Sequence, residues 1–175
     1  MIAIVPVDKI PKSDEIQDVP IATPGEVLQA YKRCLELQEL CESFGGIGIA
    51  AVQAGIPWKL FLVKSDGTND FAPRGKYGYF VNCEYEPTTD CQRIVSLEGC
   101  LSLRSPDGRL RHFQVERWNN VRILGHCIDD NNKLIIKKVN FEIGIAKQSV
   151  VFQHEIDHGK GVLISDNGKE LYLWK

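Results

Sequence analysis

The sequence predicts a single α+β domain with an N-terminal helix, several mostly antiparallel strands and a central His-Glu-x-x-His helix packed among the sheets. Three observations predict it: a helical pattern over residues 24–44, short β-rich runs from residue 47 to about residue 138, and a helical segment that ends at His158. This order differs from the alternation of strands and helices in a parallel α/β fold. Because 175 residues fit one domain and no linker or repeat interrupts them, we treat residues 1–175 as one unit.

The first helix has signals at both ends. Thr23 is an expected N-cap, Pro24 suits the first helical position, and Gly45-Gly46 suits the C-terminal end. Apolar residues recur at helical spacing, so Cys34 and Cys41 are expected to face the core. The apolar set is Val27, Leu28, Tyr31, Cys34, Leu35, Cys41 and Phe44.

The middle of the chain predicts strands separated by turns rich in Asp, Asn, Gly and Pro. The expected strands are Ile47–Val52, Lys59–Val63, Tyr77–Cys83, Arg93–Leu97, Val121–Ile128 and Lys133–Lys138. Residues 129–132 (Asp-Asp-Asn-Asn) are expected to close a hairpin between the last two. A second helix is expected to begin near Asn140, as N-cap, and to run through His158 to a stop at Gly159.

The composition narrows the class of protein. A net charge of −2 argues against nucleic acid as a direct partner, because phosphate binding usually leaves a basic footprint. The short apolar N-terminus lacks a basic region before it and runs into Asp8, so we expect no signal or transit peptide. No window is apolar enough to span a bilayer, and the six cysteines are expected to be reduced thiols. A cytoplasmic protein without a membrane partner is therefore expected.

The segment Gln153–His158 carries the strongest chemical signal. On a helix, His154 and His158 lie on one face and can hold one metal ion, while Glu155 can reach a metal-bound water. Such a motif arises by chance in roughly one in a few hundred chains of this length. The apolar residues 150–152 drive the segment into the core, where unpaired His and Glu would be costly.

Two histidines do not complete a catalytic metal site, which usually has three protein ligands and one open position. His112 and His126 do not have a metalloprotease spacing. A metalloprotease of this type would need a distant Glu as its third ligand, and Glu170 is the only Glu after His158. Cys100, after Gly99 in the run Glu98–Ser102, is the better candidate. Taken alone, Cys100 would more often be a buried structural thiol.

The run Gly46–Gln53 is the third unusual segment. Its small residues allow another backbone to approach, and an exposed strand edge there could pair with an extended peptide. The side chain of Gln53 offers an amide donor. By itself, a Gly/Ala-rich strand after a helix is more often a packing device.

Together the three runs resemble the signature motifs of the peptide deformylases: GφGφAAxQ, EGCφS and QHExDH, in which φ is apolar. The run Gly161–Leu163 also resembles the family's continuation. The resemblance implies hydrolytic removal of the formyl group from N-terminal formyl-methionine of new polypeptides, with release of formate. It assigns the metal to Cys100, His154 and His158.

The same resemblance implies the other roles. Glu155 would be the general base acting on a metal-bound water, and the Gln53 side chain and the Leu101 backbone N–H would stabilise the oxyanion. The peptide would lie along Ile47 and Gly48, with its methionine side chain in an apolar pocket partly lined by Ile47 and by Val150 near the start of the second helix, and Gly99 would also bind it.

The resemblance also implies the cofactor and the partners. It implies one divalent ion, Fe²⁺ first and otherwise Zn²⁺, Ni²⁺ or Co²⁺, which a thiolate and two imidazoles suit. The expected partners are formyl-Met peptides or nascent chains, with a transient ribosome contact and a monomeric enzyme. A bacterial cytoplasm or a phage-infected host is the expected setting, since short family members include phage-encoded ones.

The chain departs from the family pattern at several positions. Gly159 replaces the usual Leu after the second His, and Arg104 follows Leu103 where many members have Pro. The segment Arg104–Arg111 is therefore expected to shape the outer peptide pocket differently. Glu98 is expected to be structural, with Arg109 or Arg111 as its partner.

The sequence alone leaves two rival hypotheses. One is a metallopeptidase that shares only the His-Glu-x-x-His helix, and the other is a catalytically dead homologue that binds peptide N-termini. The intact Gln53, Cys100 and Glu155 argue against the second.

Overall fold

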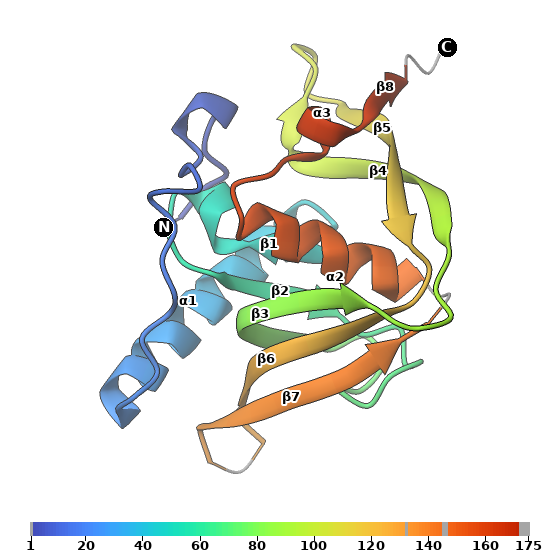
Figure 1. Ribbon diagram of the computed structural model, residues 1–175. Coiled ribbons are helices and arrows are strands. Elements are labelled where there is room, and N and C mark those ends of the chain that lie inside the picture. The colour runs from blue at the N-terminus through green and yellow to red at the C-terminus, as the bar shows by residue number, and fades with distance from the viewer. Residues whose placement is uncertain (1, 132, 145–146, 172–175) are drawn as a thin grey trace.

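The computed structural model describes residues 2–131, 133–144 and 147–171 and shows the predicted α+β architecture, with two antiparallel sheets and α-helices (Figure 1). Its elements follow in chain order: η1 (Val7–Lys9), α1 (Pro24–Ser43), β1 (Gly48–Ala50), η2 (Ala51–Ala54), β2 (Leu60–Lys64), β3 (Tyr77–Pro87), β4 (Arg93–Arg104), β5 (Leu110–Trp118), β6 (Val121–Asp129), β7 (Ile135–Ile143), α2 (Lys147–His158), α3 (Ile164–Asn167) and β8 (Lys169–Leu171).

The larger sheet has five strands in the order β1-β2-β3-β6-β7, so β1 forms one of its edges. On one face it packs against α1 through buried residues such as Leu37, Cys41 and Leu62. On the other face it packs against α2, where Phe152 contacts the rings of Phe61 and Phe80 edge to face, with centroids 5.8 and 4.8 Å apart. The apolar side of α2 therefore packs against the five-stranded sheet.

The smaller sheet has three strands in the order β4-β5-β8, and β4 forms one of its edges. Figure 1 shows α2 lying between the two sheets, with β4 and β5 on one side and β2 and β3 on the other. The side chain of Gln153 fastens the helix to β5, because it accepts a hydrogen bond from Trp118 N and donates one to Trp118 O, at 2.9 and 2.8 Å. The helix that carries the His-Glu-x-x-His motif is thus held from both sides.

The first helix begins as predicted. Thr23 Oγ1 accepts from Glu26 N and the Glu26 carboxylate accepts from Thr23 N, which forms a capping box. Cys34 and Cys41 are fully buried, as expected. Leu28 and Leu35 are 45% and 39% exposed instead, because each lies one position beyond the buried stripe formed by Val27, Ala30, Cys34, Leu37 and Cys41.

The predicted start of the second helix near Asn140 is wrong. Asn140 lies in β7 and pairs with Leu124 of β6, and α2 begins only at Lys147. The β6–β7 hairpin predicted from residues 129–132 is present, but its second strand continues to Ile143, which pairs with Val121. Pairing with a long partner strand decided the conformation of residues 139–143, and a local N-cap signal could not reveal that pairing.

Two further strand predictions need correction, and two strands were missed. The strand expected over Ile47–Val52 is only Gly48–Ala50, and a 3₁₀ turn follows, closed by Gly55 with φ of 73°. The strand expected to end at Leu97 continues through Cys100 to Arg104. The strands β5 and β8 were not predicted; β5 alternates buried and exposed residues, whereas β8 has only three residues.

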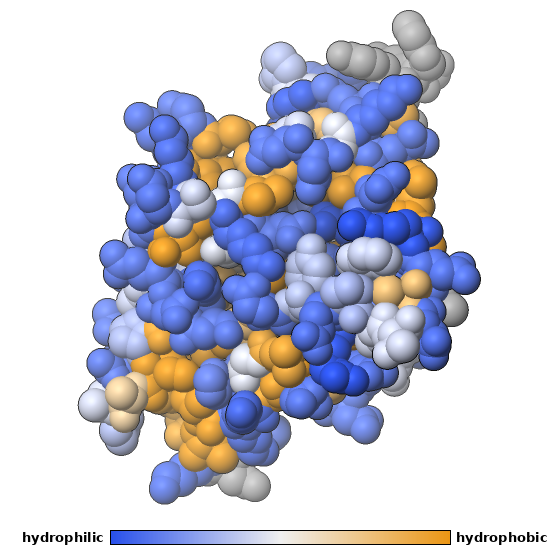
Figure 2. All heavy atoms as spheres, viewed as in Figure 1, coloured by the Kyte–Doolittle hydropathy of each residue, from blue (hydrophilic) through white to orange (hydrophobic). Residues whose placement is uncertain are grey.

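Hydrophilic residues cover most of the face seen in Figure 2, and a hydrophobic area lies at its lower left, over the region of α1 and the β6–β7 hairpin. Tyr31 of α1 donates a hydrogen bond of 2.5 Å to Asp130 of the hairpin. Among the described residues, no helix is long and apolar enough to cross a membrane.

Candidate metal centre and active site

Three buried side chains converge between α2 and β4. The ligand atoms of Cys100, His154 and His158 all lie within 4.8 Å of one another, and Cys100 Sγ is 3.3 Å from His158 Nε2. Their exposed fractions are 1%, 8% and 1%. A thiol and two imidazoles gathered at this spacing form a donor set that suits a divalent transition metal.

The local structure explains why these three meet. His154 and His158 are four residues apart on α2 and therefore share one face, as the sequence predicted. Cys100 follows Gly99 at a register shift: Gly99 pairs with His112, but the next pair is Arg104 with Leu110. Residues 100–103 thus leave the β4–β5 ladder, and this irregularity positions the thiol.

Each imidazole is oriented by its other nitrogen. His154 Nδ1 lies 2.8 Å from Glu98 Oε2, and His158 Nδ1 lies 3.1 Å from the carbonyl oxygen of Val162. These contacts place the N–H of each ring on Nδ1 and leave Nε2 as the electron-pair donor. The Nε2 atoms of both rings are therefore available to bind one ion.

Glu98 belongs to a buried charge network that the sequence did not predict. Arg117 of β5 binds both Glu98 oxygens, at 2.8 and 2.9 Å, and binds Asp157 of α2 at 2.5 Å. Tyr85 donates to the other Asp157 oxygen at 3.1 Å.

The predicted partners of Glu98 are wrong, because Arg109 pairs with Asp107 and Arg111 with Glu170. The missed signal was the period-two pattern of Phe113, Val115 and Arg117, which places an arginine on the buried face of β5.

The electrostatics of the network favour charged forms. Burial alone would raise the pKa of Glu98, but hydrogen bonds from Arg117 and His154 outweigh it and hold the pKa at about 2. Burial likewise opposes ionisation of Cys100, yet the positive charge of His158 and His154 in their protonated forms, with their hydrogen bonds, holds the pKa of its thiol well below the usual value. A thiolate is the form in which cysteine binds a metal.

Glu155 lies beside this group. Its side chain is buried, with 4% exposure, and burial raises its pKa to about 7. Among the described residues its Oε2 atom has no hydrogen-bond partner. An orphaned carboxylate oxygen next to three converging ligand atoms is where a metal site with a water would fit, since buried polar groups are normally satisfied.

Gln53 reaches the same place from the turn after β1. Its Oε1 accepts from Ala50 N at 2.8 Å, which fixes the amide, and its Nε2 lies 3.3 Å from Cys100 Sγ and 3.2 Å from Ser102 Oγ. The 3₁₀ turn is what brings this side chain back to the site. In an uninterrupted strand over residues 47–52, Gln53 would have continued away from it.

A cavity of about 540 Å³ opens onto Glu155 and His154. It lies between the edge strands β1 and β4, and Lys147, Val150 and Val151 of α2 form its floor. Gln53 and Leu101 line it, and so do the four residues predicted to contact the peptide: Ile47, Gly48, Gly99 and Val150. The structure therefore brings together all the predicted site residues.

Gly48 should be intolerant of a side chain, because a Cβ there would lie 2.6 Å from Glu155 Oε1. We expect Gly48→Ala to displace the carboxylate and to lower kcat/KM by about 100-fold, the usual cost of a misplacement near 1 Å. Steady-state assay of formate release measures the effect. Gly144→Ala is the control, since no atom of the described residues lies within 4 Å of a Cβ there; equal activity of the two variants would contradict the prediction.

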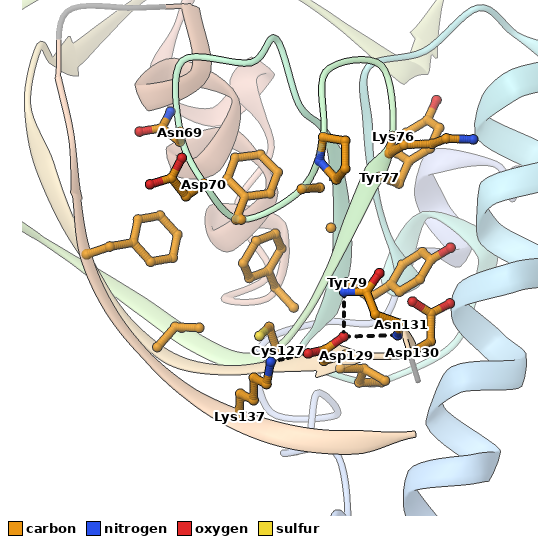
Figure 3. Close-up of a pocket in the computed structure, with 18 of the residues that line it drawn as sticks. Asn69, Asp70, Lys76, Tyr77, Tyr79, Cys127, Asp129, Asp130, Asn131 and Lys137 are labelled. Atoms are coloured by element: carbon orange, nitrogen blue, oxygen red, sulfur yellow. Dashed lines mark hydrogen bonds and ion pairs between the residues drawn. The ribbon is translucent and has the colours of Figure 1, made fainter. Parts of the chain in front are cut away.

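A larger cavity of about 920 Å³ lies elsewhere, between the end of α1, the loop of residues 66–76, β3 and the β6–β7 hairpin. Figure 3 shows polar groups of the hairpin pairing with one another there: Asp129 contacts Lys137 and accepts hydrogen bonds from the backbone N and the side-chain amide of Asn131. None of the three converging ligands lines it. We therefore assign the candidate metal centre and active site to the smaller cavity.

Comparison with known proteins agrees with this geometry. A family model described as polypeptide deformylase matches residues 10–173. A peptide deformylase of Rhodopseudomonas palustris is 32% identical over 156 residues, covering 86% of this chain and 79% of the relative. That of Thermodesulfovibrio yellowstonii is 29% identical over 166 residues, covering 94% and 88%.

Solved structures share the fold. The Met-Ala-Ser-bound peptide deformylase of Acinetobacter baumannii superposes with a TM-score of 0.71 at 23% identity, covering 95% of this chain and 96% of that one. A probable peptide deformylase of a Synechococcus phage gives 0.65 at 22% identity, covering 95% and 99%. The family match extends over nearly the whole sequence and the fold agrees, so the chain belongs to the polypeptide deformylase family.

Proposed function

We propose that Glu155 is the general base and proton carrier of formyl hydrolysis, at a metal ion held by Cys100, His154 and His158. As a member of its family the chain is a hydrolase that removes the formyl group from new polypeptides. The observation that carries the proposed roles is the buried Glu155 carboxylate, with one unpartnered oxygen, beside the three converging ligand atoms and on the peptide-sized cavity.

The donor set fits a divalent ion. The thiol of Cys100 has a lowered pKa, and the Nδ1 atom of each imidazole already contacts an oxygen of the protein. One sulfur and two Nε2 atoms therefore remain as ligands. When bound, the ion would act as a Lewis acid on the formyl oxygen and lower the pKa of a water molecule. We propose Fe²⁺ as the native ion, with Zn²⁺, Ni²⁺ or Co²⁺ as alternatives that the same ligands accept.

The peptide is proposed to bind in extended form between β1 and β4. Each is the terminal strand of its sheet and both border the cavity, so either edge can pair with an added strand. Ile47 and Val150 offer apolar surface to the methionine side chain, while Gly48 and Gly99 let a backbone approach closely. The Met-Ala-Ser peptide in the A. baumannii structure supports peptides as the substrate class.

The chemistry divides among the residues of this chain. Glu155 removes a proton from the attacking water, whose oxygen bonds to the formyl carbon, and later delivers that proton to the methionine nitrogen as the C–N bond breaks. The Gln53 amide and the Leu101 N–H donate to the oxygen that becomes negative. Formate and a free α-amino group result.

The deciding experiment uses protein purified anaerobically and loaded with Fe²⁺ or Ni²⁺. Formate release is measured from formyl-Met-Ala-Ser and from acetyl-Met-Ala-Ser. We expect turnover of the formyl peptide and far slower turnover of the acetyl peptide. No formate from fully metallated protein, or equal turnover of both peptides, would refute the proposal.

Cys100→Ala tests the ligand assignment separately. We expect it to lose both bound metal and turnover, whereas a metallopeptidase that used only the two histidines and a distant carboxylate would retain activity. Metal content is measured by atomic absorption on the same sample. We further propose a monomer that meets nascent chains through a transient ribosome contact, in a bacterial cytoplasm or a phage-infected host; light scattering and ribosome co-sedimentation test the first two.

A further inference from the structure

Exposed apolar side chains gather at the mouth of the active-site cavity. Nine large hydrophobic residues among those described are 36–67% exposed, and four of them line this single cavity: Phe44, Ile47, Leu97 and Leu110. Contiguous exposed apolar surface usually marks a binding site. Here the surface is continuous with the catalytic residues, which identifies its occupant as the substrate.

Two walls face each other across this mouth. Phe44 and Ile47 come from the connection between α1 and β1, and are 45% and 38% exposed. Leu97 of β4 is 58% exposed, and it shares its face of the strand with Gly99 because strand side chains alternate. The side chain of Leu110 lies against Gly99, 3.6 Å from where a Cβ would be.

The first wall is held in place by the β4–β5 hairpin. The guanidinium of Arg104 lies over the Phe44 ring, 4.9 Å from its centroid. The same guanidinium donates to Leu101 O at 3.3 Å and to Gly108 O at 2.7 Å. An exposed aromatic ring fixed in this way loses little freedom on binding, which favours its use as a contact surface.

Position along β4 identifies which part of the substrate meets Leu97. Leu97 lies three residues before Cys100, so it is about 10 Å along the strand at roughly 3.3 Å per residue. An extended peptide with its formyl group near Cys100 would also span roughly 3.3 Å per residue. Its second and third residues would then lie beside Leu97, Leu110 and Phe44.

We propose that Leu97, with Leu110 and Phe44, makes this enzyme selective for apolar side chains at the second and third residues of the formylated peptide. The inference rests on the proposed function, because it assumes that the formyl group reaches Glu155. It adds a specificity determinant outside the catalytic group, and it predicts which nascent chains are processed fastest.

The test compares kcat/KM for two peptide series, formyl-Met-X-Ser and formyl-Met-Ala-X, with X as Leu, Ser or Asp. In a half-open groove we expect the leucine peptides to be favoured over the serine peptides about tenfold in at least one series, mainly through KM. Leu97→Ser should reduce that ratio to about threefold or less, and Leu97→Ile should retain it.

Leu28→Ser is the matched control, since Leu28 is similarly exposed but lies on α1 and does not line the cavity. It should keep the wild-type ratio. Formate release without a leucine preference in either series, or an unchanged ratio in Leu97→Ser, would overturn this inference and leave the proposed function standing. No formate from any formyl peptide would overturn both.

Discussion

Glu155→Gln is expected to lower kcat by about 1,000-fold while the metal stays bound. General acid–base catalysis contributes about 10²–10⁴-fold, and an amide of the same shape cannot accept and return the proton. The ligand atoms of Cys100, His154 and His158 belong to other side chains and should be undisturbed. Formate release under single-turnover conditions, with metal content measured on the same sample, checks both parts.

The stability of this variant separates chemistry from folding. The Glu155 side chain is buried and burial raises its pKa, so a neutral amide removes the cost of burying charge. We expect Glu155→Gln to melt at or above the wild-type temperature. Retention of more than a tenth of the wild-type kcat, with metal bound, would mean that another group moves the proton.

Arg117→Ala should be the most destabilising single change at the site. Arg117 is 2% exposed and binds Glu98 and Asp157, so its removal leaves two buried carboxylates without their counter-charge. Loss of one partner from a buried ion pair costs about 3–5 kcal/mol. For a chain of this size that lowers Tm by about 6–20 °C, measured by circular dichroism on metal-free protein.

Arg122→Ala is the matched control. Arg122 also faces two carboxylates, those of Glu86 and Glu142, but its side chain is 44% exposed. Exposed ion pairs contribute about 0–1 kcal/mol, so this change should scarcely move Tm. If the two variants lost the same stability, the network around Glu98 would not be acting as a buried charge cluster.

Arg117→Ala should also weaken metal binding, because Glu98 orients His154. Loss of such supporting contacts typically costs 10–100-fold in metal affinity. Titration with Ni²⁺ or Co²⁺ below the melting temperature measures it. The effect would distinguish a network that positions a ligand from one that only holds two sheets together.

The sequence pattern correctly predicted those features of the fold that depend on residues close together in the chain. The cap at Thr23, the core-facing side of α1 at Cys34 and Cys41, and the four-residue spacing of His154 and His158 all depend on neighbours within one or two turns. The same holds for the hairpin at residues 129–132, although its second strand was predicted too short. The N-cap expected at Asn140 failed because pairing with β6 outweighs a capping preference of about 1 kcal/mol.

The sequence by itself determined the α+β class, the ends of α1, the two histidines on one helix face and, through three motifs, the family. The tertiary structure decided how the motifs meet. Gln53 reaches Cys100 across 47 positions, and Arg117 joins Glu98 and Asp157 across 19 and 40. Such contacts depend on strand order, a register shift in β4 and a 3₁₀ turn after β1, none of which local periodicity encodes. Burial then gives these contacts their strength, because charges removed from water must be paired.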